Sequence, residues 1–394
     1  MKRLYATLSM SVVFHLMTFA TVHAQALSPK AQLGQQLFFD KNLSEPSGQA
    51  CSSCHAPLAA FTDADKTRPT SKGVDPSLRG SRNAPTIMYA AFSPIFHFDK
   101  QANLYQGGQF WDGRASTLRE QAKGPFLNPI EMANPTPDAV IEKIKKSSTT
   151  DYQRTFEAIY GQNILDSMRA YDAVVDAIAA FERSDVLNPF TSKYDLYLFG
   201  KALFSASERR GLRLFEGKGN CIACHSSRPI NGTPPLFTDF TYDNIGVPKN
   251  PDNPFYQLPR PFNPDGLAFV DLGLGGHLAE PNHEGKFKVP TLRNIALTPP
   301  YTHNGYFTTL RGVVTFYSTH NVIKHCAKAL VDEKTALQTK CWPTPEVPQN
   351  VNVSELGNLK LNQSEINDLV AFLNTLTDGY SNVSPWPSPL SSLK

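Results

Sequence analysis

The sequence predicts a mainly α-helical protein made of two similar domains, related by internal duplication and carrying long ordered loops. The main observation is that three short stretches occur twice, in the same order, along the 394 residues. The matched pairs are LGQQLFFDK at 33–41 with RGLRLFEGK at 210–218, 84–97 with 289–303, and 112–120 with 304–312. Repeats that keep their order along a chain indicate copies of one structural unit. We therefore expect the two halves to fold alike.

Apolar residues at helical spacing support the helical prediction. They recur in this way between residues 136 and 185. Near the C-terminus, Asn362 and Glu365 can form a capping box at the start of a helix. The residues that follow give it one apolar face: Ile366, Leu369, Val370, Leu373 and Leu376. By contrast, residues 229–288 are rich in Pro and Gly, which predicts a long ordered loop.

The N-terminus has the pattern of a secretory signal peptide. Lys2 and Arg3 precede an apolar stretch, and small residues then offer cleavage near Ala24 or Ala26. An uncleaved membrane anchor is the alternative, but the apolar core is short and interrupted for a spanning helix. We expect an exported, periplasmic protein with no membrane span after processing. The predicted divisions are a signal peptide at 1–24, an N-terminal domain at 25–188 and a C-terminal domain at 189–394.

The net charge of the chain is small. There are 38 Lys and Arg residues and 35 Asp and Glu residues, which gives a formal net charge of +3 at pH 7. Loss of Lys2 and Arg3 with the signal peptide brings the chain closer to neutrality. A near-neutral chain lacks the basic footprint of a nucleic-acid partner or an anionic membrane surface, so we expect neither.

Two C-x-x-C-H motifs, CSSCH at 51–55 and CIACH at 221–225, indicate covalent haem attachment. The two thiols form thioethers to the haem, and the adjacent histidine coordinates the iron. The residues concerned are Cys51, Cys54, His55, Cys221, Cys224 and His225. Zinc is the competing interpretation, but structural zinc usually takes ligand pairs about 15–20 residues apart, and a thioredoxin-like motif lacks its β-α-β context. Each half is thus expected to be a cytochrome-c-like domain around one haem.

The two remaining cysteines, Cys326 and Cys341, fit a disulfide. An oxidising compartment favours their pairing. Closing a loop of this length stabilises a protein by about 3 kcal/mol in the chain-entropy model. Two independent buried thiols are the alternative.

The second ligand of each iron separates an electron carrier from an enzyme, because an open iron can bind peroxide whereas a six-coordinate haem transfers electrons. The repeat places Pro125 and Tyr317 at equivalent positions. Proline cannot ligate iron, and a phenolate can. This predicts an open first haem and a second haem ligated by Tyr317, with a core aromatic as the alternative for the tyrosine. His303 could line the second haem, and His97 is a candidate ligand only in an unexpected fold.

Several stretches resemble the bacterial di-haem cytochrome c peroxidase and MauG family. They are QFWDGRASTLREQAKGPFLNPIEM, KVPTLRNIALTPPYTHNG and VVTFY, and the resemblance covers nearly all of residues 27–380. It implies that the N-terminal haem reacts with hydrogen peroxide and that the C-terminal haem stores or relays an electron. A tryptophan between the haems corresponds to Trp111, and a glutamate in the peroxide pocket corresponds to Glu131, with Gln121 nearby. A calcium ion between the domains is implied at Asn83 and at the backbone carbonyls of Thr298 and Pro300.

The chain differs from the peroxidase branch of this family in two ways. The loop at 61–86 has no histidine, where many of those enzymes carry a distal one, and Tyr317 stands where they carry a methionine. Both differences resemble the MauG branch, in which the ligand is Tyr and the first haem is open without prior reduction. MauG oxidises residues of a partner protein, but nothing in this sequence identifies such a partner.

Peroxide cleavage also needs a group that moves a proton to the leaving oxygen, and a carboxyl group in an apolar pocket can do this. Glu131 lies six residues after Pro125 and is the candidate, with a surface glutamate as the alternative. Trp111 could likewise be a core residue rather than a relay.

Three functions follow from these observations. The first is a peroxidase that takes electrons through the second haem from a small c-type cytochrome or a copper protein. The second is a MauG-type oxidase that acts on a protein or organic substrate. The third is a two-haem electron-transfer cytochrome that is not an enzyme.

Overall fold

The computed structural model describes residues 26–148, 150–229 and 232–380, so the predicted signal peptide at 1–24 lies outside the described residues. The described chain is mostly helical, as the sequence predicts. The helices are α1 (Pro29–Phe39), α2 (Cys51–Cys54), α3 (Leu118–Leu127), α4 (Pro137–Lys145), α5 (Tyr152–Tyr160), α6 (Ala170–Glu182), α7 (Lys193–Leu198), α8 (Ala206–Glu216), α9 (Gly273–Leu278), α10 (Leu310–Thr319), α11 (Glu333–Thr339) and α12 (Gln363–Asn374). The strands are β1 (His97–Asp99), β2 (Leu104–Gln106), β3 (Tyr242–Asp243) and β4 (Phe287–Lys288).

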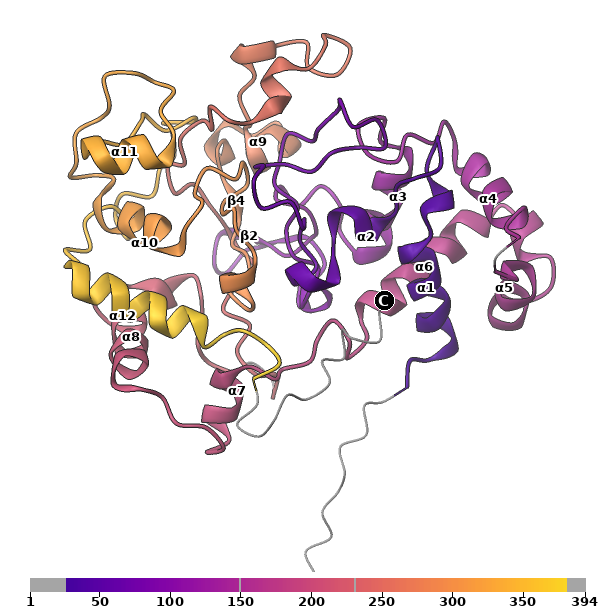
Figure 1. The fold of residues 1–394 in the computed structure, drawn as a ribbon, viewed down its shortest axis with the longest axis horizontal. Coiled ribbons are helices and arrows are strands. Elements are labelled where there is room, and N and C mark those ends of the chain that lie inside the picture. Colours follow the sequence, from indigo (N-terminus) through magenta and orange to yellow (C-terminus); the bar gives the residue numbers. More distant parts are fainter. Residues whose placement is uncertain (1–25, 149, 230–231, 381–394) are drawn as a thin grey trace, which may run out of the picture.

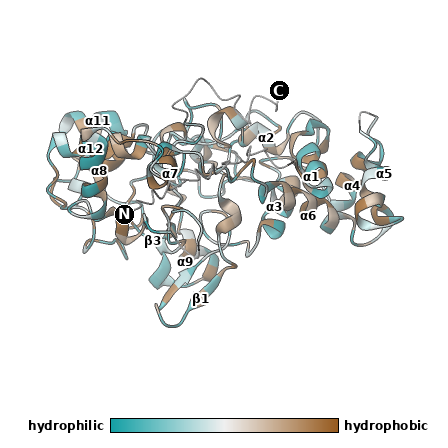
Figure 2. Cartoon of the chain, turned by 90° about the horizontal axis from the view of Figure 1, so that it is seen from below, coloured by the Kyte–Doolittle hydropathy of each residue, from teal (hydrophilic) through white to brown (hydrophobic). Residues whose placement is uncertain are grey.

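The helices form two groups at opposite ends of the molecule. Figure 1 shows α1 and α3–α6 at one end and α8, α10, α11 and α12 at the other, and Figure 2 shows the same separation for the helices that it labels. In the first group α1 and α3 pack on α6, around a core that includes Phe38, Phe61 and Phe181. In the second group α8 and α10 pack on α12, around Phe215 and Phe372. Each half therefore has its own apolar core.

A repeated glycine explains how closely these helices pack. A Cβ atom on Gly34 of α1 would lie 1.8 Å from the Ala177 backbone oxygen, and one on Gly211 of α8 would lie 2.0 Å from the Asp368 backbone oxygen. Both are the glycine of the repeated G-x-x-L-F pattern. Any larger residue would force the helix pairs α1–α6 and α8–α12 apart, so the repeat has a packing cause in both halves.

Helix caps show why these segments begin where they do. The expected capping box at α12 is present, since the Asn362 side chain accepts from the Glu365 N–H and the Glu365 side chain accepts from the Asn362 N–H. Ser205 and Glu208 form the same box at α8. Such caps satisfy N–H groups that the first helical turn leaves without partners.

The two halves meet through loops and short strands. The Pro- and Gly-rich stretch at 229–288 contributes α9, β3 and β4, and a bridge between Gln106 and Thr241 connects it to the N-terminal half. Arg82 forms ion pairs of 2.7 Å with both Asp112 and Asp271, which belong to different halves. All three side chains are largely buried, so the pairing fixes the junction strongly.

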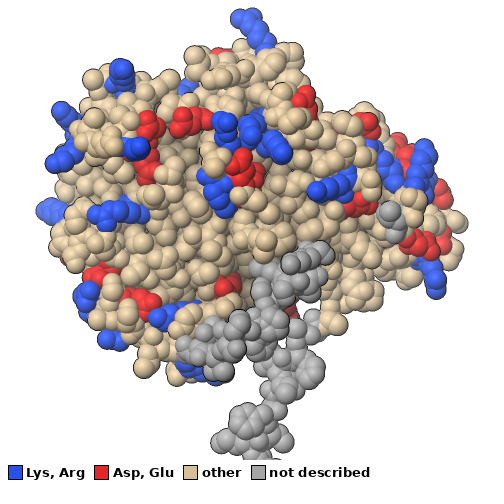
Figure 3. Space-filling view, viewed as in Figure 1, with Lys and Arg blue, Asp and Glu red and all other residues tan. Residues whose placement is uncertain are grey.

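The structure also shows a disulfide and the distribution of charge on the surface. Cys326 and Cys341 are joined by a disulfide, with 4.9 Å between their Cα atoms. On the face drawn in Figure 3, acidic and basic side chains are interspersed over the surface. Among the helices in the described part of the chain, none is both long and apolar enough to cross a membrane.

Candidate di-haem cavity

One cavity of about 630 Å³ extends between the two C-x-x-C-H motifs. It is lined by both motif histidines and by every other residue predicted for haem binding, catalysis or calcium except Cys51, which lines a smaller adjoining cavity of about 60 Å³. The lining thus includes Cys54, His55, Asn83, Trp111, Gln121, Pro125, Glu131, Cys221, Cys224, His225, Thr298, Pro300 and Tyr317. Residues far apart in sequence are therefore brought together around one space.

The two motif histidines are held in the same way. The Nδ1 atom of His55 donates to the backbone oxygen of Phe61 at 3.0 Å, and that of His225 donates to Phe237 at 2.8 Å. Both phenylalanines have positive φ angles, 55° and 53°. A donor bond at Nδ1 leaves Nε2 as the ligand atom. Burial lowers the pKa of both imidazoles, to about 4 for His225, so each is neutral and able to bind a metal.

A second pair of matched contacts holds the residues directly before these two phenylalanines. Thr86 donates from its hydroxyl to the Ala60 oxygen at 2.6 Å, and Thr291 donates to the Leu236 oxygen, also at 2.6 Å. Both threonines belong to the repeated Pro-Thr pair of the sequence. The support of the iron ligand is therefore built alike in both halves.

The motif cysteines fit thioether formation to haem. All four are free, and burial raises the pKa of each to about 12, which keeps them as neutral thiols before attachment. Within the described residues, the one group of three metal-ligating side chains within reach of one another is Cys224, Asp243 and Glu355. That group contains neither Cys221 nor His225, so it is not the tetrahedral set of a structural zinc site. An apolar cavity beside each motif fits haem instead.

Helices α3 and α10 carry the residues predicted to face the irons. Both helices start at a threonine cap, Thr117 and Thr309, and each follows a turn closed by a single β-bridge. Pro125 and Tyr317 occupy the same place in the two helices and both line the cavity. Pro125 has no N–H group and offers no ligand atom, whereas Tyr317 offers a phenolic oxygen.

The Tyr317 hydroxyl is available as a ligand. Within the described part of the chain it has no hydrogen-bond partner, and its ring lines the cavity. Burial is the main cause that raises the pKa of the Tyr317 phenol, with smaller effects from Cys224 and Cys221. A phenolate there requires a neighbouring positive centre, which a bound iron provides.

Glu131 lies in the pocket beside the first motif, not on the surface. It lines both cavities together with Gln121 and Pro125. Its Oε1 atom accepts a 2.7 Å hydrogen bond from the Asn128 side chain. Burial raises the pKa of Glu131, while this hydrogen bond and the Arg114 charge act in the opposite direction. A carboxyl with a raised pKa beside the first motif has the properties of a proton donor.

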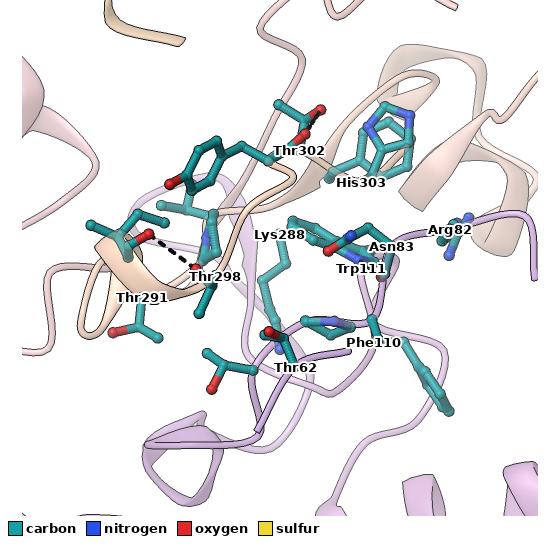
Figure 4. Close-up of a pocket in the computed structure, with 18 of the residues that line it drawn as sticks. Thr62, Arg82, Asn83, Phe110, Trp111, Lys288, Thr291, Thr298, Thr302 and His303 are labelled. Carbon is teal, nitrogen blue, oxygen red and sulfur yellow. Dashed lines mark hydrogen bonds between the residues drawn. The ribbon is translucent and has the colours of Figure 1, made fainter. Parts of the chain in front are cut away.

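Trp111 lies where the two halves meet. Its Nε1 atom donates to the backbone oxygen of Asn83 at 2.9 Å, and its own backbone oxygen accepts from the Lys288 N–H at 2.8 Å. The Asn83 N–H in turn donates to the His303 oxygen at 2.7 Å. Figure 4 shows Trp111, Asn83 and Lys288 close together in the cavity, near His303 and Arg82. Trp111 therefore contacts both halves between the motifs.

The other histidines have different environments. His303 stacks on Phe287 with 3.5 Å between ring centroids, and its Nε2 atom lies 3.9 Å from a Glu346 oxygen, so it lines the cavity at the junction. His97 lies in β1, and its Nδ1 atom donates to the Ile95 backbone oxygen. His97 is exposed and does not line the cavity.

Two cavity residues were missed by sequence reasoning. Glu182, at the end of α6, is 3% exposed, and burial raises its pKa to about 8. Lys288 also lines the cavity. Lys288 directly precedes the repeated stretch at 289–303, and this position could have indicated that it lines the cavity. Nothing in the local sequence pattern marks Glu182 in this way.

Comparisons with known proteins agree with this arrangement. The family model described as di-haem cytochrome c peroxidase matches residues 28–203. The chain is 40% identical over 356 residues to the methylamine utilization protein MauG of Paracoccus denitrificans, covering 88% of each chain. It is 34% identical over 285 residues to the cytochrome c551 peroxidase of Nitrosomonas europaea, covering 72% of this chain and 71% of that one.

Solved structures give the same result. The diheme peroxidase BthA of Burkholderia thailandensis matches with a TM-score of 0.75 and 32% identity, covering 92% of this chain and 90% of that one. A MauG-like protein associated with microbial copper homeostasis matches with a TM-score of 0.67 and 27% identity, covering 95% of this chain and 98% of that one. The chain belongs to the di-haem cytochrome c peroxidase and MauG family of oxidoreductases. Membership implies two c-type haems, which the cavity and its motifs fit.

Proposed function

We propose that this protein is an exported peroxidase that reduces hydrogen peroxide at the N-terminal haem, with electrons relayed through the C-terminal haem. The observation that carries the proposal is the difference between equivalent positions of one cavity: Pro125 offers no ligand beside the first motif, and Tyr317 offers one beside the second. Bound haem supplies iron that can react with peroxide where a coordination position is open and can transfer electrons where both positions are filled.

The residues of the first pocket have distinct roles in this proposal. His55, held by the Phe61 carbonyl, is the proximal ligand. Glu131 holds a proton and moves it to the leaving oxygen of peroxide. Asn128 fixes the Glu131 carboxyl by its 2.7 Å hydrogen bond, and Gln121 on α3 lines the same pocket and orients the substrate.

Electrons reach this pocket across the junction of the halves. Trp111 contacts Asn83 on one side and Lys288 on the other, and lines the cavity between the motifs. An aromatic ring in this place is suited to relay an electron. We propose a small c-type cytochrome or a copper protein as the external donor.

A MauG-type oxidase of a protein or organic substrate is the second candidate. Tyr317 in place of methionine and the 40% identity to the Paracoccus MauG protein favour it. A non-enzymatic electron-transfer cytochrome is the third, and the lack of a ligand atom at Pro125 argues against it.

The proposal also includes the domain boundaries, export to the periplasm and a calcium site. The separate apolar cores support domains at 25–188 and 189–394, related by duplication. Cleavage near Ala24 or Ala26 would release the protein to the periplasm. Asn83, Thr298 and Pro300 line the cavity at the junction, which supports the proposed calcium site between the halves.

One experiment separates the candidates. Peroxide is added to the purified protein with a reduced small cytochrome c, and cytochrome oxidation is followed together with the electron paramagnetic resonance spectrum of the diferric protein. The peroxidase should oxidise the cytochrome catalytically and show one high-spin and one low-spin haem. A high-spin haem without cytochrome turnover supports the oxidase. Two low-spin haems and no turnover overturn the enzyme proposals in favour of the electron carrier.

A further inference from the structure

A single lysine crosses the junction between the two halves inside the haem cavity. Lys288 belongs to β4, in the C-terminal half, and its Nζ atom donates to the backbone oxygen of Gly108, in the N-terminal half, at 2.6 Å. Its backbone N–H is fixed by the Trp111 oxygen. Lys288 is half-buried, and its open side faces the cavity, beside Trp111 in Figure 4.

The charge of this lysine is not balanced by a carboxylate. Among the ion pairs of the described residues, none includes Lys288. The Asp112 carboxylate, whose field acts on it, is already held by Arg82 at 2.7 Å and by Arg114 at 2.9 Å. Burial lowers the pKa of Lys288 to about 8. An ammonium whose one hydrogen-bond acceptor is a neutral carbonyl is costly to bury. The cavity is therefore prepared for an anion.

We propose that Lys288 binds a propionate carboxylate of a haem across the junction of the two halves. In c-type haem the thioether positions and the propionates lie on different edges of the ring. The motif cysteines hold the first edge, so the propionates extend into the rest of the cavity. Two described lysines that line it have no ion pair, and of these Lys72 is exposed whereas Lys288 is half-buried. A carboxylate there would complete the hydrogen bonds of the ammonium. The inference rests on the haem binding of the proposed function, and not on peroxide turnover.

Such a contact has a consequence for electron transfer. A cation beside a propionate neutralises negative charge near the iron and disfavours its oxidised, more positive state. Because Lys288 is tied to Gly108 and to Trp111, it would place this charge beside the proposed relay.

The test compares Lys288→Met with Lys286→Met. Lys286 lies two residues earlier, does not line the cavity, and has its Nζ atom 3.5 Å from the His283 ring, so it is a matched control. Lys288→Met should keep both covalent haems by intact mass, lower the midpoint potential of one haem, and shift a propionate bending band in the resonance Raman spectrum. Lys288→Arg should restore both values, and Lys286→Met should change neither.

Unchanged potentials and propionate bands in Lys288→Met, or equal changes in Lys286→Met, would overturn the inference. If Lys288→Met does not fold, a crystal structure of the wild-type holoprotein decides: Nζ within about 3.2 Å of a propionate oxygen supports the contact, and Nζ turned away from both haems refutes it. These readouts are independent of turnover. If the wild-type protein lacks peroxidase activity but Lys288→Met shifts the potential and the propionate band, the proposed function is refuted and the lysine contact stands. If the protein is an active peroxidase but Lys288→Met shifts neither value, the lysine contact is refuted and the proposed function stands.

Discussion

Helices α3 and α10 are built alike but differ at a position that faces the cavity. Both begin at a threonine cap after a bridged turn, and both line the cavity together with a motif histidine held by a phenylalanine carbonyl. At the same place α3 has Pro125 and α10 has Tyr317. The difference teaches that one scaffold can be kept while a single side chain changes, and in the proposed function that side chain decides whether an iron is open to substrate or closed by the protein.

The place of Pro125 near the C-terminal end of α3 explains why the helix tolerates a proline. A proline inside a helix removes one backbone hydrogen bond and crowds the preceding turn. Pro125 stands in the last turn, two residues before the helix ends at Leu127, and the Asn128 N–H still donates to Gly124 at 3.1 Å. The cost therefore falls on a short end of the helix.

The largest effect should come from removing one motif at a time. Cys51→Ser with Cys54→Ser should leave covalent haem only in the C-terminal half, because thioether attachment needs the thiols. Intact mass and haem-stained denaturing gels measure this.

The mirror variant, Cys221→Ser with Cys224→Ser, is the matched control and should leave haem only in the N-terminal half. Two covalent haems in either double variant would show that the motifs do not attach haem in the way the comparison requires.

The next effect concerns Glu131, which has no carboxyl counterpart at the corresponding place beside Tyr317, where Ile323 stands. Glu131→Gln should keep both haems and lose peroxide turnover by ~10²–10⁴-fold, the usual contribution of a general acid–base group. Steady-state peroxide reduction measures the loss. Glu142→Gln is the control, because Glu142 forms surface ion pairs of small value.

The pH dependence of turnover sharpens this test. Burial raises the pKa of Glu131, so the protonated acid persists to higher pH than in an exposed glutamate. Turnover that depends on this proton should be full below the raised pKa and decline as the pH rises through it. That decline should be absent from the residual activity of Glu131→Gln. A pH profile shared by both proteins, or turnover within twofold of wild type, would remove Glu131 from the mechanism.

A third test addresses Tyr317 directly. A phenolate is a hard, anionic ligand that favours ferric iron, so Tyr317→Phe should alter the low-spin signal of the diferric protein and leave the high-spin signal in place. Tyr317→Met should raise the potential of the second haem. Electron paramagnetic resonance and redox titration measure both.

Tyr301→Phe is the control, since Tyr301 also lines the cavity and is 8% exposed. If Tyr317→Phe keeps the low-spin signal and its potential, the tyrosine is a packing residue. His303, at the junction beside Glu346, would then be the next candidate ligand.

The features that could be predicted from the sequence are those that depend on a few neighbouring positions along the chain. The haem motifs, the G-x-x-L-F repeat and the α12 capping box each need only a few neighbouring positions, and the structure gives each a physical cause. Alignment of the repeats also brought Pro125 and Tyr317 to equivalent places. Lys288 and Glu182 could not be found in this way, because their burial depends on how distant segments close around the cavity. The Arg82 ion pairs with Asp112 and Asp271 likewise exist only after the halves meet.

The smallest effect should arise at the proposed calcium site, where the two halves are compared as partners. Asn83 holds the junction mainly by its backbone, which accepts from Trp111 and donates to the His303 oxygen, and those contacts survive in Asn83→Ala. The substitution removes the side-chain oxygen, a ligand type that calcium prefers.

Chelation of calcium and Asn83→Ala should therefore have the same result: both haems stay covalently bound, while electron movement from the second haem to the first becomes slower. Stopped-flow spectroscopy of the half-reduced protein measures that rate, and elemental analysis verifies the metal content. Asn42→Ala, which alters an exposed hydrogen bond to Asp40 and does not touch the cavity, is the control. If calcium-free wild-type protein transfers electrons at the original rate, the ion has no role between the halves. If Asn83→Ala slows electron transfer while calcium stays bound, the Asn83 side chain acts through its 3.1 Å hydrogen bond to the Pro69 oxygen instead.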